Sequence, residues 1–227
     1  MIYRKEQLEK MADGINDKFF PERLYKAQKL DPYDLLEREN CTVDWKYISP
    51  NADILGMTFF KEGAWPIWDT GKFISSSRPH FESFQKGTII INQAVLDKKN
   101  NRKQENYIVA HEVAHWIKDQ DYFSANEGSP VQICKKNSFG KTYWSNSMDE
   151  LEIIERQTNY LCTAILLPRD ILKKEFFRIG RYKNVPNQPI QYTNYMKGWI
   201  GELSTIYELN FNPILYRLYD IGVIERP

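Results

Sequence analysis

The sequence predicts an α+β fold in which a small, mostly antiparallel sheet packs against one central apolar helix, with further helices towards both ends. Three observations predict it. Apolar residues recur at helical spacing near both ends, strand-forming runs fill residues 41–92, and a strongly apolar helical stretch covers residues 107–117. The chain has 227 residues, of which 42% are hydrophobic, so we expect one compact domain made of an N-terminal helical segment (1–40) and a main domain (41–227).

The first 40 residues are predicted to form two or three short helices rather than a single long one. Pro21 ends the first apolar series, and Pro32 interrupts the second. The apolar side chains that define the first helix are Leu8, Met11, Ile15 and Phe19.

Residues 41–92 have the pattern of strands. We expect strands over 43–48, 54–60, 72–77 and 87–92, separated by turns that glycine and proline mark. The last of these runs gives the strongest strand signal, and its continuous apolar residues predict that both faces of this strand are covered.

The central helix carries His111, Glu112 and His115, which form an HExxH pattern. Histidines four residues apart lie one helical turn from each other, so their imidazoles can bind one metal ion, and Glu112 is placed to assist a metal-bound water. The alternative is a hydrogen-bonded structural cluster. The apolar surroundings favour the metal, because buried imidazoles and carboxylates need either hydrogen-bond partners or a metal ion.

A second helix is predicted over residues 147–166, opened by a capping-box pattern at Ser147 and closed by Pro168. Glu155 falls inside the apolar arc of this helix. A carboxylate there needs a cation or a hydrogen-bond partner, so Glu155 is the favoured third metal ligand, and His80, the only other histidine, is the competing one. The apolar arc consists of Met148, Leu151, Cys162, Ile165 and Leu166.

The segments around these two helices are less regular. Residues 118–147 are polar and predict a long loop that leaves the metal helix and borders a cleft. Residues 173–192 predict a polar connector. Helices are then expected over 196–206 and from Asn212-Pro213 to near Gly222.

The charge balance argues against a nucleic-acid or anionic-membrane binder, since 31 basic and 30 acidic side chains give a net charge of +1. The basic cluster at 98–103 predicts a solvated loop before the central helix, and a nucleic-acid contact there is the weaker alternative. The start of the chain is charged, with no pattern of a signal peptide, and no apolar run approaches the ~18 residues of a membrane helix. Three separated cysteines predict no disulfide and, with these observations, a cytoplasmic protein.

Together these motifs resemble the ImmA/IrrE family of metallopeptidases. In that family a strand like the one at 88–92 precedes an HExxH helix, and a later helix has the pattern E-x-x-A-N-x-F-A ending in L-L-M-P. The corresponding segment here begins at Glu155, includes Asn159 and ends at Pro168, and the resemblance covers roughly residues 43–222. The sequence departs from the family pattern in the long segment 118–147 and at Ala114, Thr158, Leu161 and Cys162.

The resemblance implies a zincin-like fold and a cytoplasmic zinc endopeptidase of narrow specificity. It implies that His111, His115 and Glu155 hold Zn²⁺ with a water in the fourth position, and that Glu112 takes a proton from that water and passes it to the leaving amine. The expected substrate is a regulatory protein such as a helix-turn-helix repressor. The candidates for a further donor to the oxyanion are Tyr122, Tyr143 and His80.

The rival class is a non-catalytic protein that uses the same fold, with a structural metal or none, to sequester a regulator. An intact Glu112 favours the enzyme, because a scaffold has no use for a general base.

Overall fold

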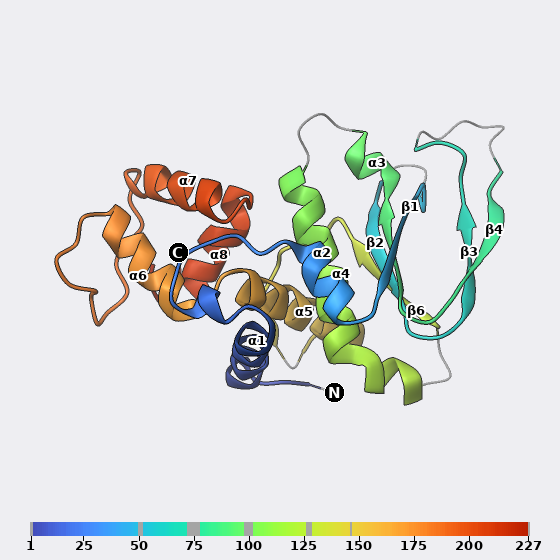
Figure 1. Cartoon of the computed structure of the whole chain (residues 1–227), viewed down its shortest axis with the longest axis horizontal. Coiled ribbons are helices and arrows are strands. Elements are labelled where there is room, and N and C mark those ends of the chain that lie inside the picture. Colours follow the sequence, from blue (N-terminus) through green and yellow to red (C-terminus); the bar gives the residue numbers. More distant parts are fainter. Residues whose placement is uncertain are drawn as a thin grey trace.

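The computed structural model describes residues 2–49, 52–71, 78–97, 102–125, 129–145 and 147–226, and within them the fold is α+β as predicted (Figure 1). The strands are β1 (Thr42–Lys46), β2 (Ile54–Phe59), β3 (Gly63–Ile67), β4 (His80–Phe84), β5 (Thr88–Asn92) and β6 (Val131–Lys135). The helices are α1 (Lys5–Phe19), the 3₁₀ turn η1 (Pro21–Leu24), α2 (Pro32–Arg38), α3 (Gln93–Leu96), α4 (Arg102–Ala125), α5 (Glu150–Leu166), α6 (Arg169–Ile179), α7 (Met196–Ile206) and α8 (Phe211–Asp220).

The main sheet has four strands in the order β1-β5-β2-β6. Strand β1 pairs in parallel with β5, and β2 pairs antiparallel with both β5 and β6. The sheet is therefore mixed and mostly antiparallel. Strand β6, which comes far later in the sequence than β2, stands at one edge.

Strand β5 is covered on both faces, as its continuous apolar run predicted. Ile89 and Ile91 join the large core that also contains α4 and α5, whereas Ile90 packs in a smaller core with Ile67 of β3 and Phe84 of β4. Strands β3 and β4 form a separate two-stranded sheet. Figure 1 shows α4 on one side of the main sheet and this hairpin on the other.

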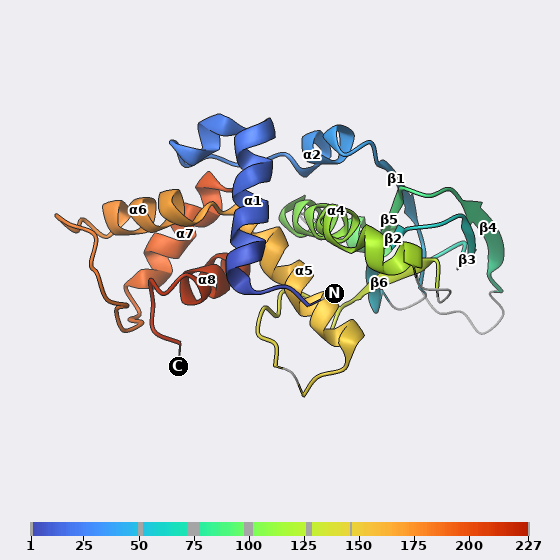
Figure 2. The ribbon, with the colours of Figure 1, turned by 90° about the horizontal axis from the view of Figure 1, so that it is seen from below.

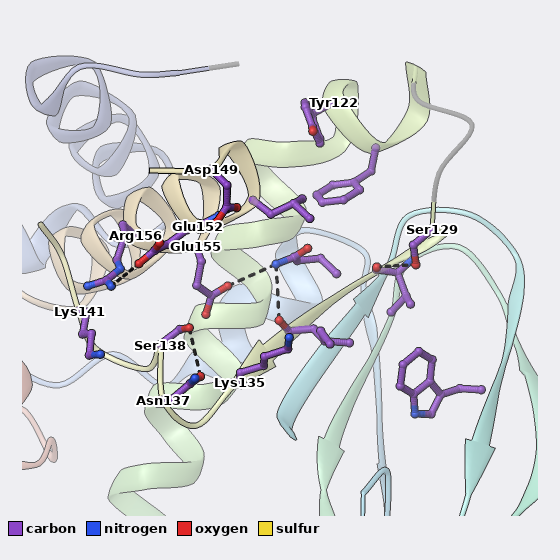
Figure 3. A pocket seen from close by; sticks show the side chains of 16 residues that line it. Tyr122, Ser129, Lys135, Asn137, Ser138, Lys141, Asp149, Glu152, Glu155 and Arg156 are labelled. Atoms are coloured by element: carbon purple, nitrogen blue, oxygen red, sulfur yellow. Dashed lines mark hydrogen bonds and ion pairs between the residues drawn. The ribbon is translucent and has the colours of Figure 1, made fainter. Parts of the chain in front are cut away.

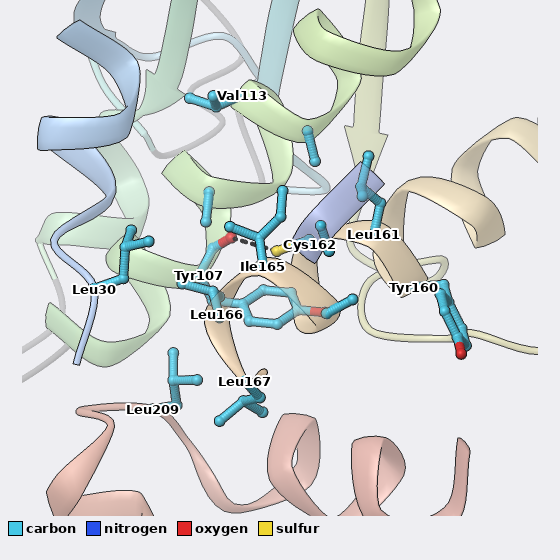
Figure 4. Close-up of a cluster of buried hydrophobic side chains, with 14 of the residues drawn as sticks. Leu30, Tyr107, Val113, Tyr160, Leu161, Cys162, Ile165, Leu166, Leu167 and Leu209 are labelled. Carbon is cyan, nitrogen blue, oxygen red and sulfur yellow. Dashed lines mark hydrogen bonds between the residues drawn. The ribbon is translucent and has the colours of Figure 1, made fainter. Parts of the chain in front are cut away.

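Helix α4 is central and packs against the sheet, α2 and α5, while α5 packs on α1 with its other side (Figure 2). Part of the α4–α5 contact is apolar. Cys162 and Ile165, both from the predicted arc of α5, are fully buried, and the Cys162 thiol lies 3.8 Å from the Tyr107 carbonyl of α4 (Figure 4). These contacts fix the two helices that carry the predicted metal ligands.

A buried ion pair joins the ends of the chain. The two carboxylate oxygens of Glu9 in α1 accept hydrogen bonds from Arg217 of α8 at 2.6 and 2.9 Å, and the Tyr160 hydroxyl of α5 donates to the same carboxylate at 2.6 Å. Three helices from distant parts of the sequence are thereby held together.

The predicted loop at 118–147 is wrong in two places. Helix α4 continues to Ala125, because Phe123 is buried and stacks on Phe60 with ring centroids 4.7 Å apart. Residues 131–135 form the edge strand β6, whose polar residues concealed it in the sequence. The rest of the segment within the described residues is turn and coil.

Other element boundaries also differ. Helix α5 is capped by Asp149, whose side chain accepts a hydrogen bond from the Glu152 amide at 2.9 Å, and not by Ser147. Leu151, placed in the apolar arc, is 52% exposed. Helix α6 occupies the first part of the predicted connector because Phe176 and its apolar neighbours are buried there.

The last helix begins at Phe211, two residues before the predicted first residue Pro213, and its N-cap is Asn210 where Asn212 was expected. Strands β3 and β4 were not predicted. The strand expected at 72–77 and most of the basic cluster at 98–103 lie outside the described residues. Within the described parts of the chain, no helix combines the length and the apolarity that crossing a membrane requires.

Candidate metal centre

Three predicted ligands meet between α4 and α5. His111 and His115 of α4 are fully buried, with rings edge to face at 4.7 Å, and Glu155 of α5 is 4% exposed. One Glu155 oxygen lies 3.3 Å from His111 Nε2, and the other lies 3.0 Å from His115 Nε2. Donor atoms from all three residues lie within 4.8 Å of one another.

The donor atoms of this cluster fit a metal ion better than a hydrogen-bonded network. Neither ring nitrogen of His111 has a hydrogen-bond partner, and neither does Glu155 Oε1, although all three atoms are buried. His115 Nε2 and Glu155 Oε2 are hydrogen-bonded at 3.0 Å. Buried polar atoms are normally paired, so the unpaired atoms of His111 and Glu155 that converge beside them indicate a missing shared partner. Two imidazoles and one carboxylate are ligands for a divalent ion. His111, His115 and Glu155 could therefore hold a metal.

The competing ligand His80 lies elsewhere. Its side chain is 56% exposed at the start of β4, where Nε2 is 2.9 Å from Glu82. It belongs to neither of the ligand groups found in the described residues. His80 therefore lies in an exposed strand, apart from the other two histidines and Glu155.

A second layer of side chains orients His115. Its Nδ1 lies 2.8 Å from Asp119 Oδ2 and 3.1 Å from the Thr158 hydroxyl, so Nε2 is left facing Glu155. Asp119 also accepts a hydrogen bond from the buried Lys118 ammonium. Such partners fix the ring and strengthen a histidine ligand. Sequence reasoning missed Asp119, although it follows His115 at the i+4 spacing that brings side chains together on a helix.

Glu112 points towards β2 and is fully buried. Its Oε2 accepts a hydrogen bond from the Thr58 hydroxyl at 2.8 Å, while Oε1 has no partner. Gly56 makes room for this carboxylate, because a Cβ at that position would lie 2.7 Å from Oε1. The Cys134 thiol of β6 lies within 4.8 Å of donor atoms of His111 and Glu112, forming a second possible ligand group that the sequence did not reveal.

Burial and close contacts shift the pKa values of the ionisable side chains in this cluster. Burial opposes charge on His115, but Asp119 and Glu155 raise its pKa to about 9. Burial alone would raise the pKa of Glu155, yet His111 and His115 lower it well below its usual range. Burial raises the pKa of Glu112 to about 8, a shift that His115 and Thr58 partly offset. Positive charge is therefore stabilised on His115, whereas burial lowers the pKa of His111.

A cavity of about 750 Å³ adjoins this cluster, and Glu155 forms part of its wall (Figure 3). It lies between α5, β6 and the C-terminal turn of α4. Of the three candidate oxyanion donors, only Tyr122 lines it; Tyr143 and His80 do not. The segment predicted to border a cleft does so, through β6 and the turn that follows it.

Neither protein-family models nor curated proteins gave a match to this chain. Its function must be inferred from the side chains of the site themselves.

Proposed function

We propose that this protein is a zinc-dependent endopeptidase in which His111, His115 and Glu155 hold the metal and Glu112 transfers protons. The observation that carries the proposal is the convergence of donor atoms from His111, His115 and Glu155, together with the unpartnered buried atoms of His111, Glu112 and Glu155, beside a cavity that Glu155 lines. Two imidazoles and one carboxylate are the ligand set of catalytic zinc, which keeps a further position open. Magnesium and calcium prefer sites built wholly from oxygen ligands.

The two oxygens of Glu112 support separate tasks. Thr58 holds Oε2 in place, and Oε1 has no other partner, so it is available to accept a proton from an attacking water and to return it to the leaving amine. Zinc, when bound, supplies the Lewis acidity that activates water and polarises a carbonyl. A protein that only sequestered a regulator would not need the free oxygen of Glu112.

The substrate that we propose is a regulatory protein in the cytoplasm, such as a helix-turn-helix repressor. This part of the proposal follows from the resemblance to the ImmA/IrrE pattern. The three cysteines, all buried and free, are consistent with a reducing compartment.

Metal content and cleavage of a repressor encoded beside this gene, each measured with and without chelator, test the proposal. Glu112→Gln should keep stoichiometric zinc and lose cleavage, whereas His115→Ala should lose both. His80→Ala is the matched control and should change neither, since His80 lies on the exposed hairpin.

Two results would overturn the proposal. Absence of stoichiometric zinc from purified wild-type protein would contradict the metal site. A repressor that is bound but left intact with zinc present would favour the protein that only sequesters a regulator. The ligand assignment fails separately if Glu155→Ala binds zinc as tightly as wild type.

A further inference from the structure

The cavity beside Glu155 has two ends of different chemistry. In Figure 3, Lys135, Ser138 and Lys141 lie on one side of Glu155, and Tyr122 lies on the other, at the end of α4. The first end is formed by the last residue of β6 and the turn after it. The second end is formed by the last turns of α4 and the first turn of α5.

The turn that connects Lys135, the last residue of β6, to Lys141 is fastened to α5. Asn159, fully buried, donates a hydrogen bond to the Ser138 carbonyl at 3.0 Å and accepts one from the Gly140 amide at 3.0 Å. Gly140 adopts φ +74°, which glycine tolerates without strain. The lysines are therefore presented from a defined turn beside the metal cluster.

No carboxylate of the described residues pairs with the positive charge at this end of the cavity. Within the described residues, the ammonium groups of Lys135 and Lys141 have neither an ion-pair nor a hydrogen-bond partner. The carboxylates that line the same cavity are engaged elsewhere.

Each of those three carboxylates has its own partner. Glu152 pairs with Arg156 at 2.6 Å, Asp149 caps α5, and Glu155 faces the two histidines. Two unpaired ammonium groups in the wall of a cavity favour an anionic group on whatever enters it.

The opposite end of the cavity offers apolar surface. Phe123 of α4 and Val131 of β6 line it, and Leu151 of α5 lines it while remaining 52% exposed. Ligand pockets are lined mostly by apolar side chains with a few placed polar groups, which fits this lining. Leu151 stands one helical turn before Glu155, so this surface adjoins the metal cluster.

We propose that the cavity recognises a peptide segment with an acidic side chain at the Lys135–Lys141 end and an apolar side chain at the Leu151 end. The inference rests on the proposed function, since it names the substrate class for that same site. The carboxylate of the substrate pairs with the two lysines, and this pairing sets which peptide bond lies beside Glu155 and Glu112.

Selection of peptides from a random displayed library on zinc-loaded Glu112→Gln protein tests this inference without requiring cleavage. The selected pool should be enriched in Asp and Glu at one position and in apolar residues at another. Lys135→Glu combined with Lys141→Glu should shift the first preference to Lys and Arg. Binding of a selected acidic peptide should weaken by about tenfold or more, because each reversal replaces an attraction with a repulsion.

Lys136→Glu is the matched control, because Lys136 is an exposed neighbour of the same charge that does not line the cavity. It should leave the selected sequences unchanged. A pool without acidic enrichment, or one with the same charge preference after the double reversal, would overturn the subsite.

Failure of the proposed function looks different from failure of the subsite. Peptides that bind with the acidic preference but remain uncut by wild-type protein contradict the endopeptidase and retain the subsite. Peptides that are cut but show no charge preference support the endopeptidase and contradict the subsite.

Discussion

Replacing Asp119 by Asn should affect two properties of the protein by separate routes. Asp119 is 2% exposed and contacts both His115 Nδ1 and the Lys118 ammonium. Loss of a carboxylate behind a histidine ligand lowers metal affinity by about 10–100-fold. The Lys118 side chain is fully buried, so its charge loses its counter-ion, and breaking a buried pair costs about 3–5 kcal/mol of unfolding free energy.

The double variant Lys118→Met, Asp119→Asn separates these effects. Removing the ammonium together with the carboxylate should restore most of the stability, since apolar replacements of buried ion pairs are often neutral or stabilising. Zinc affinity should stay low, because His115 still lacks the carboxylate. Denaturant unfolding in chelator measures the first property, and competition with a chromophoric chelator measures the second.

Two outcomes would refute this reasoning. If Asp119→Asn leaves the unfolding free energy unchanged, the charge of Lys118 is not held by Asp119. If the double variant regains wild-type zinc affinity, the affinity loss in the single variant came from destabilisation and not from His115.

Two further changes test other parts of the structure. Gly56→Ala should displace the Glu112 carboxylate, because the new Cβ would lie 2.7 Å from Oε1. The cleavage rate should then fall by on the order of 10²-fold with zinc content unchanged. The control Gly14→Ala, whose added Cβ would have open space around it, should change neither property. Glu9→Gln should lower the unfolding free energy at pH 7 by about 3–5 kcal/mol, because it leaves Arg217 buried and unpaired. Burial would raise the pKa of Glu9, but Arg217 lowers it below its usual value of 4.5. The unfolding free energy of the wild type should therefore exceed that of the variant above this pH, and the difference should shrink as the pH falls below it. An equal difference in unfolding free energy at pH 7 and pH 3, measured by denaturant titration, would contradict this.

The site residues that could be predicted from the sequence are those whose positions follow from the geometry of a single helix. His111 and His115 are one turn apart on a single helix, and the buried position of Glu155 follows from the spacing of apolar residues around it. The two helices meet because each presents an apolar face, which the sequence also displays. Local periodicity therefore sufficed to predict that His111, His115 and Glu155 meet.

The parts that sequence missed depend on contacts between distant segments. Thr58 and Gly56 reach Glu112 because β2 pairs with β5 and packs under α4. Cys134 and the lysine-bearing turn reach the site only through the pairing of β6 with β2. Polar residues in a five-residue strand gave no alternation long enough to reveal that pairing.

The departure from the ImmA/IrrE pattern at Thr158 acquires a physical meaning in this structure. Where that pattern has alanine, Thr158 places a hydroxyl 3.1 Å from His115 Nδ1 and 3.3 Å from Asp119. The hydroxyl also donates to the Ile154 carbonyl of its own helix at 2.9 Å, so it has a partner whether or not it bonds the histidine. An apolar residue would fill the space without a buried polar group to satisfy. Because buried charges and hydroxyls are poorly explained by stability alone, their concentration behind one histidine supports a site in which the orientation of that ring matters.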